Sequence, residues 1–186
     1  MFLVPKEAPG LSLGKKERKM GYGGSPTCEL VFDDCVVSTG ALLGQEGYGF
    51  SIAMKGLDRG SISTGAMALG PAQCAFEEAA EYARTSVHFG RPISQFQGIR
   101  WMLVDMAMEI EAFRLLVHRA ASLCGRSLPF TKEAAMAKCY ANDMAMRVST
   151  DTVQIFGGHG YIRDYPAKRH MRDVKFMQIV EETNQI

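Results

Sequence analysis

The chain has 186 residues, of which 47% are hydrophobic, and its 21 basic and 20 acidic side chains leave a formal net charge of +1. This length suits one or two domains with a buried core. The nearly balanced charge argues against a nucleic-acid groove or a polybasic membrane patch, and no apolar run is long enough to cross a bilayer.

The first 47 residues contain short apolar runs that are separated by glycine and proline, such as LSLG, CELVF and ALLG. This pattern is typical of strands and turns. After residue 47 the apolar spacing becomes helical. We therefore expect a strand-rich domain over residues 1–47 and a helical domain over residues 48–186.

The helical part is expected to begin with two long helices. The first runs from about Phe50 to Val87 and should kink near Pro71, because proline cannot donate a backbone hydrogen bond. The second carries apolar residues at unbroken steps of three and four, which predicts one buried face. These apolar residues are Phe96, Ile99, Leu103, Met106, Ile110, Phe113 and Val117.

A third long helix is expected from Thr131, as N-cap, to a stop at Gly157 and Gly158. Short helices should follow around Ala167–Asp173 and from Glu181 onward. The predicted fold class is α+β and mostly α, with a short antiparallel β segment followed by an antiparallel bundle of long helices.

Five cysteines are scattered along the chain without a C-x-x-C motif, and none lies at metal-ligand spacing from a histidine. We therefore expect reduced thiols and no metal site. The cysteines are Cys28, Cys35, Cys74, Cys124 and Cys139.

Three stretches could carry chemistry, although each has an ordinary structural reading. In GGHGY, Gly157 and Gly158 could provide a helix end with positive φ or allow a ligand to approach the backbone closely. In YARTSVHFGRPISQFQ, Gln97 begins a helix and could offer its amide to a polar ligand. In QIVEETNQI, Glu181 and Glu182 are by default exposed acids.

Taken together and in order, these stretches resemble the carboxy-terminal half of the acyl-CoA dehydrogenase family. The resemblance covers the whole chain, and the ordered set is far more specific than any one string. It implies that residues 1–47 are part of the family's middle β-domain and that residues 48–186 are its carboxy-terminal helical bundle. The stretches are MGYGGSPTCELVFDDCVV, GLDRG, YARTSVHFGRPISQFQ, AAMAKCYANDMA, VQIFGGHGYIRDYPAKRHMRD and QIVEETNQI.

The resemblance implies FAD-dependent α,β-dehydrogenation of a short- or medium-chain acyl-CoA thioester. The α-hydrogen of a thioester is weakly acidic, so a carboxylate in a dry pocket must remove it. Glu181 matches the base of most family members. A minority place the base at the position of Gly60, which has no side chain here.

Further roles and partners are also implied by the resemblance. Asp58 matches a position near the pantetheine of CoA. We expect an electron-transfer flavoprotein as electron acceptor, a homotetramer, and location in the bacterial cytoplasm or the mitochondrial matrix. The residues that match FAD contacts are Phe89, Gln97, Gln154, Gly157, Gly158, Thr183 and Gln185.

The chain departs from the family pattern at several positions. Gly23, Ser61 and Ser86 stand where arginine is usual, and Glu182 stands where glycine is usual. In the family, the arginine at the position of Ser86 normally binds the FAD pyrophosphate through two hydrogen bonds. Serine has no guanidinium group for that contact. These departures support an alternative function, a truncated or degenerate member that acts as an assembly module without tight FAD binding.

Overall fold

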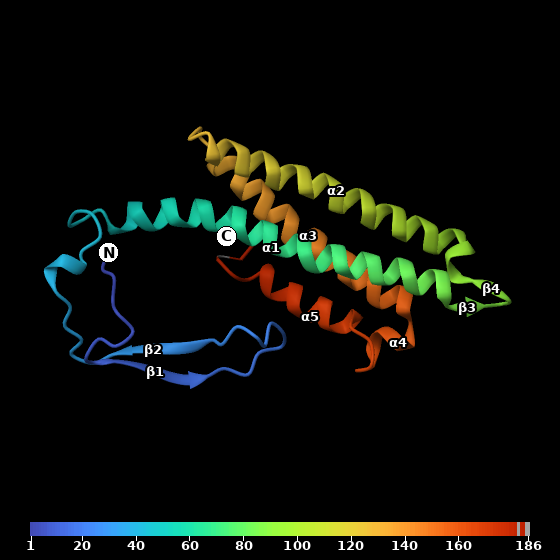
Figure 1. The fold of residues 1–186 in the computed structure, drawn as a ribbon, viewed down its shortest axis with the longest axis horizontal. Coiled ribbons are helices and arrows are strands. Elements are labelled where there is room, and N and C mark those ends of the chain that lie inside the picture. The colour runs from blue at the N-terminus through green and yellow to red at the C-terminus, as the bar shows by residue number, and fades with distance from the viewer. Residues whose placement is uncertain (182, 185–186) are drawn as a thin grey trace. The chain divides into compact units, whose positions relative to one another are not determined.

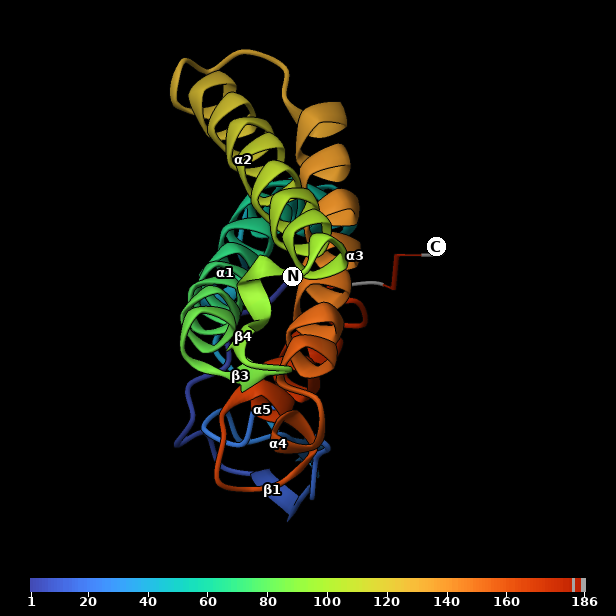
Figure 2. The same ribbon diagram turned by 90° about the vertical axis from the view of Figure 1, so that its right-hand side faces the viewer.

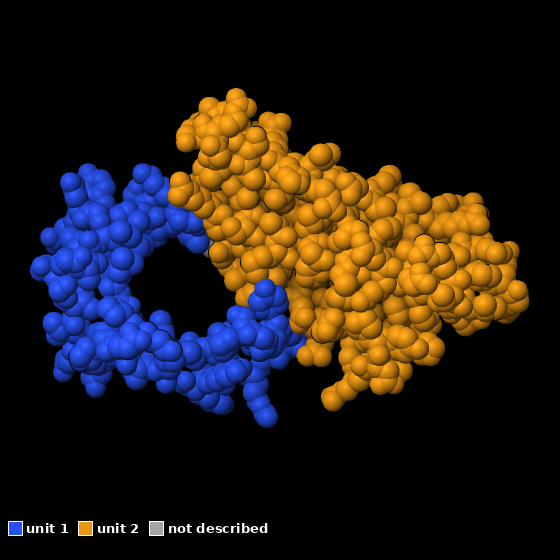
Figure 3. All heavy atoms as spheres, in the orientation of Figure 1, with its two compact units in different colours: residues 1–57 blue, residues 58–186 orange. Residues whose placement is uncertain are grey.

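The computed structural model describes residues 1–181 and 183–184. The chain forms two compact units, Met1–Leu57 and Asp58–Ile186, which Figure 3 shows in separate colours. The boundary between the units lies inside the first long helix, α1 (Gly49–Thr85).

The first unit contains an antiparallel hairpin. Strand β1 (Leu11–Lys16) pairs with β2 (Cys28–Phe32), and Leu13 lies opposite Leu30. Both leucines are more than half exposed. A hairpin of two strands is only marginally stable alone, but its presence confirms the expected short antiparallel β segment.

The second unit is a helical bundle. Figures 1 and 2 show α1, α2 and α3 running side by side, with α5 packed along α3. The expectation of a mostly α chain is therefore confirmed. The further helices are α2 (Gln97–Gly125), α3 (Thr131–Phe156), the short α4 (Gly158–Tyr161) and α5 (Ala167–Met177). No helix in the described residues is long and apolar enough to span a membrane.

Small side chains let α1 approach its neighbours closely. A Cβ at Gly65 would lie 3.5 Å from Val117 of α2. The hydroxyl of Thr152 on α3 donates a 3.1 Å hydrogen bond to the carbonyl of Ala75 on α1. A contact between a side chain and the backbone of a neighbouring helix is possible only where the facing residues are small. The buried residues of α1 are Thr64, Gly65, Ala68, Ala72, Ala75, Ala79 and Ala83.

The apolar stripe predicted for residues 96–117 faces the core. Its carboxy-terminal members Met106, Ile110, Phe113 and Val117 are buried, and its first members are half-buried. The helical spacing alone was therefore enough to identify the packed face of α2.

Helix α1 contains Pro71 in its interior, and the kink expected there stays a prediction. Two expectations about helix boundaries need correction. The expected cap at Thr131 was wrong, because the cap position is Phe130 and the Thr131 hydroxyl instead donates to Asp58 Oδ2 at 2.7 Å. No helix begins at Glu181, because its φ of +51° turns the chain away from helical geometry.

Candidate active site

The carboxylate of Glu181 points at helix α1. Thr64 Oγ1 donates a 2.7 Å hydrogen bond to Glu181 Oε2. On the previous turn of α1, a Cβ at Gly60 would lie 2.8 Å from Oε1. The missing side chain of Gly60 therefore leaves the space that the carboxylate of Glu181 uses.

The backbone of Glu181 is held by α3. The ammonium group of Lys138, only 8% exposed, donates to the Glu181 carbonyl oxygen. Glu181 itself is half-buried and has φ +51°. A non-glycine residue in the left-handed region costs energy and persists where its surroundings enforce it. Lys138 on α3 holds the backbone carbonyl of Glu181, and Thr64 on α1 holds its carboxylate, so contacts from two helices stabilise this conformation.

Asn184 ties the segment after Glu181 to α3. Its side-chain amide donates to Asp143 Oδ1 at 3.0 Å and to the Cys139 carbonyl at 3.3 Å, and its Oδ1 accepts from Asn142 at 3.3 Å. Among the described residues, the buried Oδ1 of Asn142 has no hydrogen-bond partner. Thr183 lies within this segment, whereas Gln185 and Glu182 lie outside the described residues.

Sequence reasoning did not identify Thr64, Lys138 or Asn142 as parts of this region. For Lys138 a signal existed, since it is a charged residue in the small and apolar stretch AAMAKC. All three are now buried, which for a polar group requires a specific partner. What the sequence lacked was the identity of that partner.

Phe89 lies at the tip of a second hairpin, between β3 (Val87–His88) and β4 (Arg91–Pro92). Its φ is +53°, that of Gly90 is +78°, and its side chain is 95% exposed. Positive φ at both central residues is typical of tight hairpin turns. A single exposed aromatic ring is common on protein surfaces, so the exposure of Phe89 by itself does not identify a binding site.

Gln97 follows this hairpin as the first residue of α2 and is exposed. Between the hairpin and α2, the ring of Phe96 is stacked under the Arg91 guanidinium at 4.2 Å and contacts Phe89 edge-on at 6.3 Å. The predicted pair Phe89 and Gln97 therefore belongs to one local surface, with Phe96 and Arg91 between them.

Gln154, Gly157 and Gly158 lie where α3 ends and α4 begins. Gly157 has φ +58°, which confirms the predicted helix stop. A Cβ at Gly157 or Gly158 would meet no atom within 4 Å, and Gln154 is exposed. The backbone is therefore open to a ligand here, as a close approach requires.

The predicted residues form two groups and not one pocket. The α3–α4 junction and the β3–β4 hairpin lie towards the same end of the bundle (Figure 1). Sixteen residues of α3 separate Lys138, beside Glu181, from Gln154, which corresponds to about 24 Å of helix. Asp58 lies on α1, two residues before Gly60, and its carboxylate accepts the hydrogen bond from Thr131.

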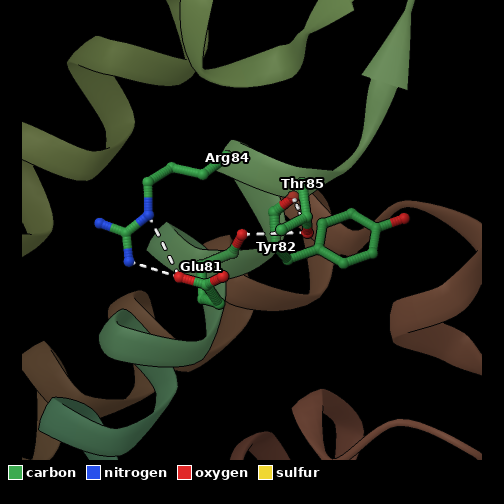
Figure 4. A network of polar contacts seen from close by, with 4 residues as sticks. All are labelled: Glu81, Tyr82, Arg84 and Thr85. Carbon is green, nitrogen blue, oxygen red and sulfur yellow. Dashed lines mark hydrogen bonds and ion pairs between the residues drawn. The ribbon is translucent and has the colours of Figure 1, made fainter.

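The arginine nearest Ser86 is already paired. Arg84 Nη2 lies 2.5 Å from Glu81 Oε2, and both side chains are largely exposed (Figure 4). In the same view the hydroxyl of Thr85 bonds back to the carbonyls of Glu81 and Tyr82. Arg84 therefore supports the last turn of α1 in this structure and does not take the place of an arginine at position 86.

Comparison with known proteins decides the family. The family model described as "Acyl-CoA dehydrogenase, C-terminal domain" matches residues 47–186. The chain belongs to the acyl-CoA dehydrogenase family. It is 52% identical over 185 residues to an acyl-CoA dehydrogenase of Bacillus subtilis, and 51% identical to a short-chain specific acyl-CoA dehydrogenase of Megasphaera elsdenii.

Solved acyl-CoA dehydrogenase structures have the same fold. Butyryl-CoA dehydrogenase from Megasphaera elsdenii superposes with a TM-score of 0.97 at 51% identity, covering 99% of this chain and 48% of that one. The human mitochondrial short-chain specific acyl-CoA dehydrogenase is 47% identical over 100% of this chain and 45% of its own length. The chain thus spans about half the length of the relatives it matches.

Proposed function

We propose that this chain belongs to an enzyme that dehydrogenates a short- or medium-chain acyl-CoA thioester at its α,β bond, with Glu181 as the base. The observation that carries the proposal is the position of the Glu181 carboxylate beside Gly60. The two base positions used within the family therefore meet in space, and only one of them has a side chain here. The names of the relatives, several of them short-chain specific, support the substrate class.

In this proposal the protein's own residues prepare and hold the base. Thr64 orients the carboxylate through its hydrogen bond to Oε2, which leaves Oε1 to receive the α-proton. Lys138 fixes the Glu181 carbonyl and thus the direction of the side chain. FAD, when bound, supplies the acceptor for the β-hydride. Asp58 is proposed to lie near the CoA portion.

The open surfaces suit the FAD contacts that the family resemblance implies. Phe89 presents an aromatic face, Gln97 and Gln154 present exposed amides, and Gly157–Gly158 present uncovered backbone. We propose these residues, with Thr183 and Gln185, as FAD ligands. About 24 Å of helix between Lys138 and Gln154 is more than one flavin ring spans, so the two groups would touch different parts of a cofactor, or cofactors of two copies of the chain.

Self-association is proposed through the outward face of α2. Four large apolar side chains there, at helical spacing, are each more than half exposed. Exposed apolar stripes of this kind are typical of protein interfaces. The four are Trp101, Val104, Met108 and Leu115. We propose a homotetramer, and we expect light scattering to show that Met108→Lys lowers the mass of the assembly.

The electron acceptor is proposed to be an electron-transfer flavoprotein. One of the similar structures, with a TM-score of 0.97 and 52% identity, is described as an electron transferring flavoprotein of Acidaminococcus fermentans. The proposed location is the bacterial cytoplasm or the mitochondrial matrix, because the relatives include both bacterial and mitochondrial proteins.

The experiment is a spectroscopic one. Purified protein should bind FAD, and its flavin absorption should bleach when butyryl-CoA is added without oxygen. Glu181→Gln should retain the flavin and lose bleaching, because the amide cannot accept the α-proton. Glu111→Gln, an exposed acid paired with Arg114 on α2, is the matched control and should bleach normally. Bleaching that persists in Glu181→Gln would remove Glu181 from its role.

The alternative function is a non-catalytic assembly module. The departures at Gly23, Ser61, Ser86 and Glu182 favour it. At Ser86, which has no substitute arginine, the FAD pyrophosphate would lose a charged partner. Protein that remains colourless in excess FAD and still forms an oligomer would support this alternative and contradict the dehydrogenase proposal for this chain.

A further inference from the structure

Among the residues that the structure describes, one other group of side chains combines a thiol, a carboxylate and an imidazole. Cys74, Glu78 and His170 each place one ligand atom within 4.8 Å of the others. Cys74 and Glu78 are one helical turn apart on α1, so they project from one face. His170 approaches from α5, 92 residues after Glu78.

The separations within this group are close to those of a tetrahedral metal site. His170 Nε2 lies 3.0 Å from Glu78 Oε2, and Cys74 Sγ donates to Glu78 Oε1 at 3.6 Å. Zinc bonds of about 2.0–2.3 Å to nitrogen, oxygen and sulfur separate tetrahedral ligand atoms by about 3.3–3.8 Å. Small side-chain rotations are therefore enough to direct all three atoms at one cation.

Burial and charge also suit a cation here. His170 is only 6% exposed and Glu78 is partly buried, while Cys74 opens to solvent and provides an entry path. A thiolate and a carboxylate together balance a charge of two. The Glu77 carboxylate adds further negative charge near the thiol, and the Arg169 guanidinium opposes it.

We propose that Cys74, Glu78 and His170 bind a borderline-soft divalent cation, with Zn²⁺ preferred, which links α1 to α5. Thiolate and imidazole ligands favour zinc over magnesium or calcium, which prefer oxygen. Three protein ligands leave the fourth position to water. Binding replaces the Sγ–H···Oε1 hydrogen bond with a metal–sulfur bond and releases the thiol proton to solvent.

This site is independent of the proposed dehydrogenase function, because it uses none of the residues assigned to FAD or the thioester. The competing explanation is a plain ion pair between His170 and Glu78 that fastens α5 to α1. The two explanations differ in the role of the Cys74 thiol, which the ion pair does not need.

Cobalt provides a direct test, since Co²⁺ occupies zinc sites and absorbs light. The full chain, without a polyhistidine tag and kept reduced, should bind one equivalent of Co²⁺. Binding should give a near-ultraviolet thiolate charge-transfer band and intense visible bands of tetrahedral cobalt, and Zn²⁺ should abolish both. Cys74→Ser should remove the charge-transfer band and weaken Zn²⁺ binding at least about tenfold. Cys139→Ser, an exposed thiol on α3, should change neither.

Thermal unfolding gives a second readout. Zn²⁺ at one hundred times its dissociation constant should raise the Tm by about 5 °C or more in the wild-type and Cys139→Ser proteins. Cys74→Ser and Glu78→Gln should show no such rise. Circular dichroism checks that both variants are folded, which the exposure of Cys74 favours. A folded wild-type chain without the charge-transfer band, or equal zinc affinity in Cys74→Ser, would overturn the proposal.

Discussion

The hydroxyl of Thr64 donates a 2.7 Å hydrogen bond to the carboxylate of Glu181, 117 residues later in the chain. Thr64 is 3% exposed and lies on a face of α1 that is otherwise formed by alanine and glycine. A hydroxyl buried on such a face needs an acceptor. The bond therefore fastens the segment after α5 to α1 and fixes where the Glu181 carboxylate points.

Replacing Thr64 with valine keeps the shape of the side chain and removes the donor. Because Glu181 Oε2 then loses its partner in a half-buried position, we expect Thr64→Val to lower the free energy of unfolding by about 1–2 kcal/mol. Urea denaturation measures this. Ser63→Ala, which removes an exposed hydroxyl that bonds to the Arg59 carbonyl within the helix, should stay within about 0.5 kcal/mol. Equal denaturation midpoints would show that the bond contributes nothing.

Tyr82 and Phe156 join α1 to the end of α3 through two separable contacts. Their rings stack with centroids 4.2 Å apart, and the Tyr82 hydroxyl lies 2.8 Å from His159 Nδ1. Phe156→Ala should lower the free energy of unfolding by about 3–5 kcal/mol because it leaves a cavity. Tyr82→Phe keeps the stacking and should cost about 1 kcal/mol. Chemical denaturation of both variants should reproduce that order, and the reverse order would refute the assignment.

Two neighbouring glycines should respond differently to alanine. A Cβ at Gly160 would lie 2.5 Å from the Val153 carbonyl, so Gly160→Ala should cost about 1–3 kcal/mol through overpacking. A Cβ at Gly158 would meet nothing within 4 Å, so Gly158→Ala should change stability by at most about 0.5 kcal/mol. Thermal unfolding checks both values. Unchanged stability with weaker FAD binding in Gly158→Ala would support backbone approach of the cofactor there.

Asp151 gives a prediction with a defined pH dependence. Burial, followed by the nearby Glu109 carboxylate, raises the pKa of Asp151 above its ordinary value of 3.8. The folded chain therefore holds this proton more tightly than the unfolded chain, and stability is lost as pH rises from the unfolded to the folded pKa. Asp151→Asn should consequently be more stable than wild type at neutral pH and equal to it in acid below the ordinary pKa.

Denaturation at several pH values measures that difference. Asp164→Asn, at an exposed position outside the helices, serves as the control and should show no gain that depends on pH. A constant offset between Asp151→Asn and wild type across the whole range would contradict the electrostatic explanation.

The local spacing of apolar residues and glycines was sufficient to predict the main helices of this chain. The steps of three and four that end in Met106, Ile110, Phe113 and Val117 predicted the buried face of α2, because helical geometry places residues at that spacing on one side. The helix stop at Gly157 could be predicted for a similar reason, since glycine alone adopts positive φ without cost. The failed cap at Thr131 shows the limit, because Asp58 on α1 took the hydroxyl that a local rule assigned to the helix end.

The sequence by itself determined the mostly helical fold and the family, since these depend on spacing and on the order of motifs, and it supplied the proposal that Glu181 is the base. Only the tertiary structure decided that Thr64 and Lys138 hold Glu181, and that Cys74 and Glu78 meet His170. The physical reason is distance along the chain. Helical periodicity relates residues three or four apart, whereas these contacts join segments far apart in the chain that tertiary packing brings together.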